Sequence, residues 1–185
     1  MLIGIGILNC SDNKLTSLLG CPVEISGDFS CFKNSLTSLV GCPSRIGGSF
    51  NCSNNELTTL EGYIIKLGGS FTCENNLLSS LIGGPVEVKG TFSCMKNQLT
   101  TLNGCPVSVG GSFYCNDNCL TSLEGCPSVE IGLDCKENNL SESESFLYHY
   151  TATQISLYYN NKNLSIDLSE VLSDVIGAEI KKNKI

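Results

Sequence analysis

The chain has 185 residues, of which 41% are hydrophobic and 16% charged, and its formal net charge is −7. This acidic balance argues against a nucleic-acid partner, which requires clustered Lys and Arg. No run approaches the ~20 consecutive apolar residues of a membrane-spanning helix, and the apolar start (residues 1–8) lacks the basic region and cleavage site of a secretory signal. We therefore expect a cytoplasmic protein with no membrane partner.

A unit of 21 residues recurs along residues 8–140. An Asn follows each cysteine of the unit by three residues, and a Leu follows that Asn by two. The cysteines are Cys10, Cys31, Cys52, Cys73, Cys94, Cys115 and Cys135. The consensus reads F-x-C-x-x-N-x-L-T-S-L-x-G-C-P-x-x-V-x-G-S. Self-similarity at a fixed period of this length is typical of solenoids.

Each unit is predicted to begin with a short strand around its cysteine. In the second unit, Phe29 and Cys31 should point inward and Ser30 outward, because side chains alternate along a strand. The Asn amide, Asn34 in this unit, can bond the backbone of the turn that leaves the strand. The Gly-Cys-Pro-x-x-Val stretch is too short and too rich in Pro and Gly for a helix, so it should be extended.

The first half of the unit resembles the leucine-rich-repeat signature L-x-L-x-x-N-x-L, with Phe and Cys in two of the Leu places. Its tight spacing is similar to the short repeats of secreted bacterial effector proteins. The resemblance covers residues 8–140 and implies a curved array, with a parallel β-sheet on the concave face and an extended convex side. Those effectors often carry a ubiquitin-ligase domain after the repeats. The ~45 residues after Leu140 are too few for one, so that activity is not carried over.

The two ends of the array depart from the pattern. Strand-like alternation returns around Tyr159, and apolar residues then recur at helical spacing between Leu168 and Ile180. We therefore predict a solenoid over 1–164 and a capping helix over 165–185. The first strand has no comparable cap, so a second copy could pair with it.

The cysteine column is predicted to be structural. Each thiol lies in its own strand, where it should behave as a small buried hydrophobe. Cys115 and Cys119 form a close pair, but a third metal ligand is not apparent. His149 has no thiol placed beside it for nucleophilic catalysis. We therefore expect no metal, no cofactor and no enzymatic activity.

A second cysteine column precedes the prolines. Cys21 and Cys42, and likewise Cys105 and Cys126, come from neighbouring repeats and could be within disulfide range. We favour the interpretation that these four cysteines are reduced, half-buried thiols in an intracellular protein.

The outward strand positions are the candidate binding surface, because the repeat leaves them free. Phe32, Met95 and Tyr114 stand out as large groups that could anchor a partner, although isolated exposed apolar residues are also normal. The full set of predicted binding residues is Phe32, Lys33, Asn54, Glu74, Met95, Lys96, Tyr114, Asn116 and Asp117.

These patterns lead to one leading function and one alternative. We expect a protein-binding module, a small effector or inhibitor of bacterial, phage or viral origin that binds a host protein through its concave face. The alternative is a structural or carbohydrate-binding adhesive protein, since Asn, Asp and aromatic side chains on one face would suit sugars.

Overall fold

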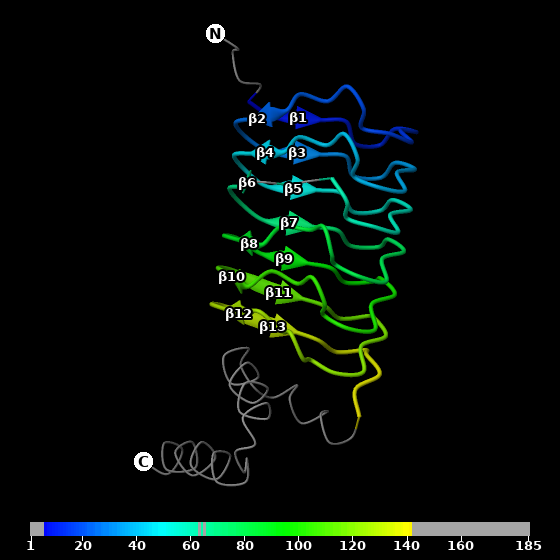
Figure 1. Ribbon diagram of the computed structural model, residues 1–185, viewed down its shortest axis with the longest axis vertical. Coiled ribbons are helices and arrows are strands. Elements are labelled where there is room, and N and C mark those ends of the chain that lie inside the picture. The colour runs from blue at the N-terminus through cyan, green and yellow to red at the C-terminus, as the bar shows by residue number, and fades with distance from the viewer. Residues whose placement is uncertain (1–5, 63, 65, 142–185) are drawn as a thin grey trace.

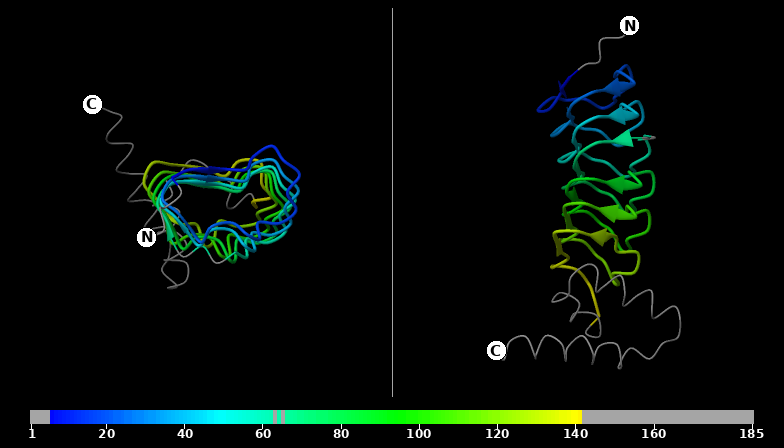
Figure 2. Two further views of the ribbon diagram at one scale, coloured as in Figure 1. Left: turned by 90° about the horizontal axis from the view of Figure 1, so that it is seen from above. Right: turned by 90° about the vertical axis from the view of Figure 1, so that its left-hand side faces the viewer.

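The repeat units form successive turns of a parallel β-solenoid (Figure 1). The computed structural model describes residues 6–62, 64 and 66–141. Seen along the stack, the turns superpose as a flattened ring (Figure 2). Equivalent residues of neighbouring units therefore lie side by side, so that every repeated column of the sequence becomes a ladder along the molecule.

One side of the coil is a parallel sheet built from the strands that contain the Phe and precede the Cys of each unit; we call it the main sheet. Along the described residues its order is β1 (Leu8–Asn9), β3 (Phe29–Ser30), β5 (Phe50–Asn51), β7 (Phe71–Thr72), β9 (Phe92–Ser93), β11 (Ser112–Tyr114) and β13 (Gly132–Asp134). The register pairs residues one unit apart, as in Phe29 with Phe50. The predicted parallel sheet is confirmed.

The Pro-x-x-Val stretches form a second side. Their strands are β2 (Glu24–Ile25), β4 (Arg45–Ile46) and β6 (Lys66–Leu67) in one sheet, and β8 (Glu87–Val88), β10 (Ser108–Val109) and β12 (Ser128–Val129) in another. The predicted extended chain is thus observed, and its units also pair with one another. The two sheets are separated after the unit in which Gly62-Tyr63-Ile64 replaces the usual Gly-Cys-Pro.

The stack is nearly straight, where the repeat resemblance implied a curved array with a concave face (Figures 1 and 2). The remaining side of each turn also bonds directly to its neighbour: the Glu56 N–H donates to the Leu36 carbonyl at 2.9 Å. Curvature requires one side of the turn to be wider than the other. Here the main sheet repeats at the hydrogen-bonded spacing of about 4.8 Å between strands, and the second side does so within each of its two sheets, so the column stays nearly straight.

The core consists of ladders of identical side chains. The Phe rings of β3 to β11 follow one another with centroids 4.9–5.8 Å apart. The cysteines that follow β5, β7 and β9 are fully buried, as predicted; they are Cys52, Cys73 and Cys94. The Leu pairs of the same units are also fully buried or nearly so. Burial of these apolar columns between turns is the main driving force for stacking.

The Asn column bonds each turn to its predecessor. The Asn76 amide donates to the Cys73 and Glu74 carbonyls of its own unit, both at 3.1 Å, and to the Cys52 carbonyl of the unit before at 3.2 Å. Its Oδ1 accepts the Leu57 N–H at 3.0 Å, also from the unit before. Four backbone groups at the corner of the coil are therefore satisfied by one side chain. The same pattern holds for Asn34, Asn55, Asn97, Asn118 and Asn138.

Several predictions about the ends fall outside the described residues: the capping helix over 165–185, the strand around Tyr159, the surroundings of His149, and residues 1–5. Within the described part, no helix is long and apolar enough to cross a membrane.

Replacing Asn76 by Ala is expected to lower the free energy of unfolding by at least 1–3 kcal/mol, on the order of the cost of leaving buried backbone groups unpaired. Asn13 is the matched control, because it is exposed and donates only to the Cys10 and Ser11 carbonyls of its own unit. Urea denaturation of both variants measures the difference. Equal losses for Asn76→Ala and Asn13→Ala would mean that the bonds between turns contribute little.

A second prediction concerns the glycine that follows the second Leu. Gly41 has a φ of 88°, and an added Cβ would lie 2.8 Å from the Leu18 carbonyl carbon of the turn before. Gly20 has a similar φ of 96° but nothing within 4 Å of an added Cβ. Gly41→Ala should therefore destabilise the protein more than Gly20→Ala, which carries only the backbone strain of about 1 kcal/mol. Thermal unfolding of the two variants tests this order.

Candidate functional site

The structure places all nine predicted binding residues on the outward face of the main sheet. Tyr114 lies on β11, and the others follow the ends of their strands by two or three residues. The register continues beyond the strands, since the Lys96 N–H donates to the Asn116 carbonyl at 3.1 Å. The set therefore occupies three parallel rows on one surface. It divides into a group near the first strands, Phe32, Lys33 and Asn54, and a group near β9 and β11, Glu74, Met95, Lys96, Tyr114, Asn116 and Asp117.

The three predicted anchors differ in exposure. Tyr114 is 39% exposed, whereas Phe32 and Met95 are half-buried on the sheet. Small neighbours share this face, and Ser53, beside Phe32 in the adjacent unit, is buried. The predicted exposure is therefore confirmed for Tyr114. Phe32 and Met95 are less exposed than predicted, because the flat sheet brings the side chains of adjacent turns into contact.

The row at the corner of the coil is polar. Its residues have positive φ, for example Lys33 at 55° and Asn54 at 56°. The Lys33 Nζ lies 2.6 Å from the Asp12 Oδ1, and this hydrogen bond raises the pKa of Lys33. The Asn54 Oδ1 accepts a hydrogen bond from the Asn75 amide at 2.6 Å. The row forms an exposed polar margin in which individual ion pairs add little stability.

Two polar atoms on this face are buried without a hydrogen-bond partner: the Ser93 Oγ and the Asn116 Oδ1. Both residues are close to Tyr114. Ser93 is paired with Tyr114 in register across β9 and β11, and Asn116 follows Tyr114 by two residues, so it lies on the same face. Unsatisfied buried groups of this kind are uncommon in folded proteins and call for an explanation.

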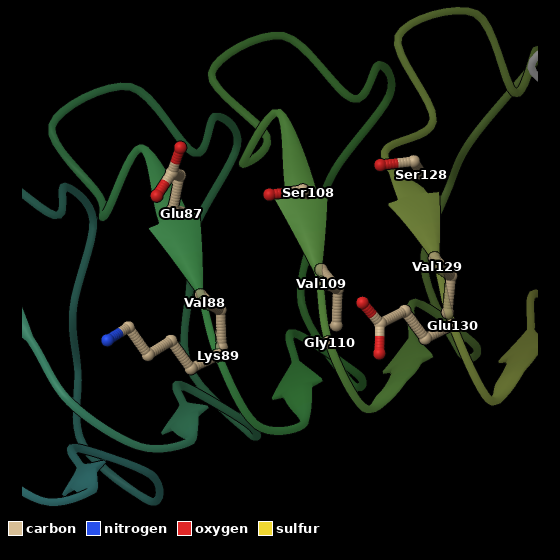
Figure 3. A pocket seen from close by; sticks show the side chains of 9 residues that line it. All are labelled: Glu87, Val88, Lys89, Ser108, Val109, Gly110, Ser128, Val129 and Glu130. Atoms are coloured by element: carbon tan, nitrogen blue, oxygen red, sulfur yellow. The ribbon is translucent and has the colours of Figure 1, made fainter.

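A groove that sequence reasoning missed crosses the second side of the coil (Figure 3). It has a volume of about 520 Å³ and lies over β8, β10 and β12. Ser108 and Gly110 of the middle strand region are small, with Glu87 and Lys89 on one side and Glu130 on the other. In the sequence, the small outward residues beside the buried Val109 could have indicated this groove. They do not define it alone, because its walls come from the neighbouring turns.

Large apolar side chains are also exposed away from the main sheet, and these too were missed. Val23, Val86 and Val107 are each at least 70% exposed, in equivalent positions after the Pro of their units. Leu19, Val40 and Ile82 form another exposed column at the turn before the Gly. The repeat itself could have indicated them, since they lie one residue after a buried column.

The cysteines are free thiols in the structure, including the Cys21, Cys42, Cys105 and Cys126 column. Burial raises the pKa of Cys42 and of Cys126 to about 12, and it raises the pKa of Cys52 well above its ordinary value. Such thiols stay protonated at neutral pH and are poor nucleophiles and metal ligands. Among the described residues, no group of three or more His, Cys, Asp or Glu side chains is arranged to hold a metal ion.

The fold and this surface define the protein as a parallel β-solenoid of stacked 21-residue turns. Comparisons with protein-family models, curated proteins and solved structures found no match.

Thiol labelling of the folded protein should separate the exposed thiol from the core. Cys119 is the one exposed cysteine of residues 6–141 and should react first, whereas Cys52, Cys73 and Cys94 should react only on unfolding. Mass spectrometry of labelled peptides identifies the sites. Rapid labelling of the three core thiols in folded protein would contradict the stacked core.

The buried thiols of Cys42 and Cys126 predict a pH dependence of stability. Their pKa values are raised in the folded state, so their contribution is fully present below the ordinary thiol pKa of about 9 and falls as pH rises above it. The midpoint temperature of unfolding should therefore drop between about pH 8 and pH 11, the interval in which the thiols of the unfolded chain ionise. An unchanged midpoint over this interval would contradict the burial of the thiols.

Proposed function

We propose that the protein is a non-enzymatic binding module that takes a partner protein on the outward face of the main sheet. The observation that supports this is the face itself: seven parallel strands present three rows of side chains that the core does not use. Extended rigid surfaces of this kind are what repeat proteins use to bind macromolecules. Tyr114 provides an aromatic anchor, and the charged corner row provides a polar rim.

We also propose a family and a biological role for the protein. The L-x-L-x-x-N-x-L pattern favours a leucine-rich-repeat protein, and the Asn ladder performs the role that such a signature requires, bonding the corner of each turn. On this basis we propose a small cytoplasmic effector or inhibitor of bacterial, phage or viral origin that acts on a host protein.

We also propose how the two ends of the array are covered. A helix over 165–185 would cover the last turn. At the other end, β1 is the outermost strand of the main sheet among the described residues, and Leu8 is only half-buried where the equivalent Phe29 is fully buried. A second copy that paired with β1 would cover this edge.

Carbohydrate binding is the second candidate function, and one observation favours it. Tyr114 is exposed beside the unpaired polar atoms of Ser93 and Asn116, and aromatic rings next to hydrogen-bonding side chains suit sugars.

Affinity capture with paired variants tests the protein-binding proposal. Phe32→Ala with Tyr114→Ala should reduce capture of the partner at least about tenfold, because anchors on the binding face carry most of the affinity. Val23→Ala with Val107→Ala is the matched control off the main sheet and should leave capture unchanged. Quantitative mass spectrometry of cross-linked complexes from the host cell measures both. Equal capture by the two variants would place the interface elsewhere.

A further inference from the structure

The strongest unexplained feature of the molecule is the hydroxyl of Ser93. Ser93 is 1% exposed, yet it points to the outward face, because Phe92 before it is buried in the core. Its Oγ has no hydrogen-bond partner. The Oδ1 of Asn116 is in the same condition one turn further along the stack.

At three equivalent positions elsewhere on the face, Ser30, Asn51 and Asp134, the side-chain oxygen has a hydrogen-bond partner. The Ser30 Oγ lies 2.7 Å from the Ser11 Oγ, and the Asn51 Oδ1 accepts the Ser53 N–H at 2.9 Å. At Asp134, the Oδ1 accepts the Lys136 N–H at 3.2 Å. Among the described residues, the two buried side-chain oxygens without a partner both belong to the region around Tyr114.

Tyr114 is the side chain that both unpaired atoms share as a neighbour. It is opposite Ser93 in register and shares its face with Asn116 two residues on. Tyr114 is 39% exposed, so this residue is accessible from solvent. Met95, two residues beyond Ser93, is half-buried on the same face. Tyr114 and Met95 can thus cover Ser93, and both side chains are long and able to rotate.

We propose that Ser93, Tyr114 and Asn116 form a subsite for a neutral, hydroxyl-rich ligand, a mono- or disaccharide. A sugar hydroxyl donates to the Asn116 Oδ1 and accepts from the Ser93 Oγ–H, which supplies both missing partners at once. The apolar face of the sugar ring packs on the Tyr114 ring after the ring turns aside to admit the ligand. The distance from Ser93 through Tyr114 to Asp134 is two strand spacings, about 10 Å, enough for one or two sugar rings.

The charges around the subsite favour a neutral ligand. The acidic side chains nearby outnumber the basic ones: Glu74, Asp117, Asp134 and Glu137 against Lys96 and Lys136. The chain as a whole also carries a net charge of −7. An acidic sugar or a phosphate would meet net repulsion here, whereas a neutral polyol would not.

This inference rests on the second candidate function, carbohydrate binding, and names its subsite and class of sugar; it is independent of the proposed protein binding, although it places a ligand on the same face. It requires no partner protein, so the two can fail separately. Sugar titration of the purified full chain tests the subsite, and capture from host cells tests the protein interface.

The experiment is saturation-transfer NMR on the full chain with a panel of neutral monosaccharides and disaccharides at millimolar concentration, and with glucuronate as the acidic comparison. Transfer to the ring protons of at least one neutral sugar, and weaker transfer to glucuronate, is expected. Tyr114→Ala and Ser93→Ala should each raise the Kd at least about tenfold, as the loss of one stacked or hydrogen-bonded contact does. Thr72→Ala, on the other register neighbour of Ser93, is the matched control and should leave the Kd unchanged.

A stability measurement keeps the result interpretable. Ser93→Ala removes a buried hydroxyl that has no partner, so its unfolding midpoint should equal or exceed that of the wild type while sugar binding is lost. The proposal is overturned if no neutral sugar shows transfer, or if transfer persists undiminished in both Tyr114→Ala and Ser93→Ala.

Discussion

The side-chain amide of the repeated Asn is the interaction on which the rest of this structure depends. Each turn of the coil must leave the main sheet through a sharp corner, and that corner exposes backbone groups that the sheet does not pair. Asn76 satisfies four of them, and two of the four, the Cys52 carbonyl and the Leu57 N–H, belong to the preceding turn. A single unit therefore cannot complete its own hydrogen bonds. Folding is a property of neighbouring turns together, as expected for a solenoid.

Once the turns are locked at this corner, the remaining geometry follows. Phe and Cys of each strand must point inward, where they meet the equivalent residues of the next turn at the spacing of paired strands. The intervening residues must point outward, which creates the face that carries Tyr114. Because the Leu-containing side and each of the two sheets on the second side are also bonded from turn to turn, the sides have similar spacing and the column remains nearly straight.

The outward face is where this regularity is relaxed. Most of its polar side chains bond to one another or to nearby backbone groups, so the face is organised and not merely solvated. Around Tyr114 the pattern is interrupted, since Ser93 and Asn116 each keep a buried polar atom without a partner. The outward positions vary more from unit to unit than the Phe, Cys, Asn and Leu columns do, and differences between outward side chains are what can distinguish one part of the face from another.

The sequence by itself determined the repeat period, the inward columns and the parallel sheet, because identical spacing of Cys52, Cys73 and Cys94 can be read without coordinates. It also placed the predicted binding residues on one face, since alternation along a strand is local. Only the tertiary structure decided how far each outward side chain is exposed: Phe32 and Met95 are half-buried and Tyr114 is open, and this depends on neighbours 21 residues away. The straight stack, the groove beside Ser108 and the unpaired Ser93 hydroxyl arise for the same reason, that each is a relation between turns and not a property of one.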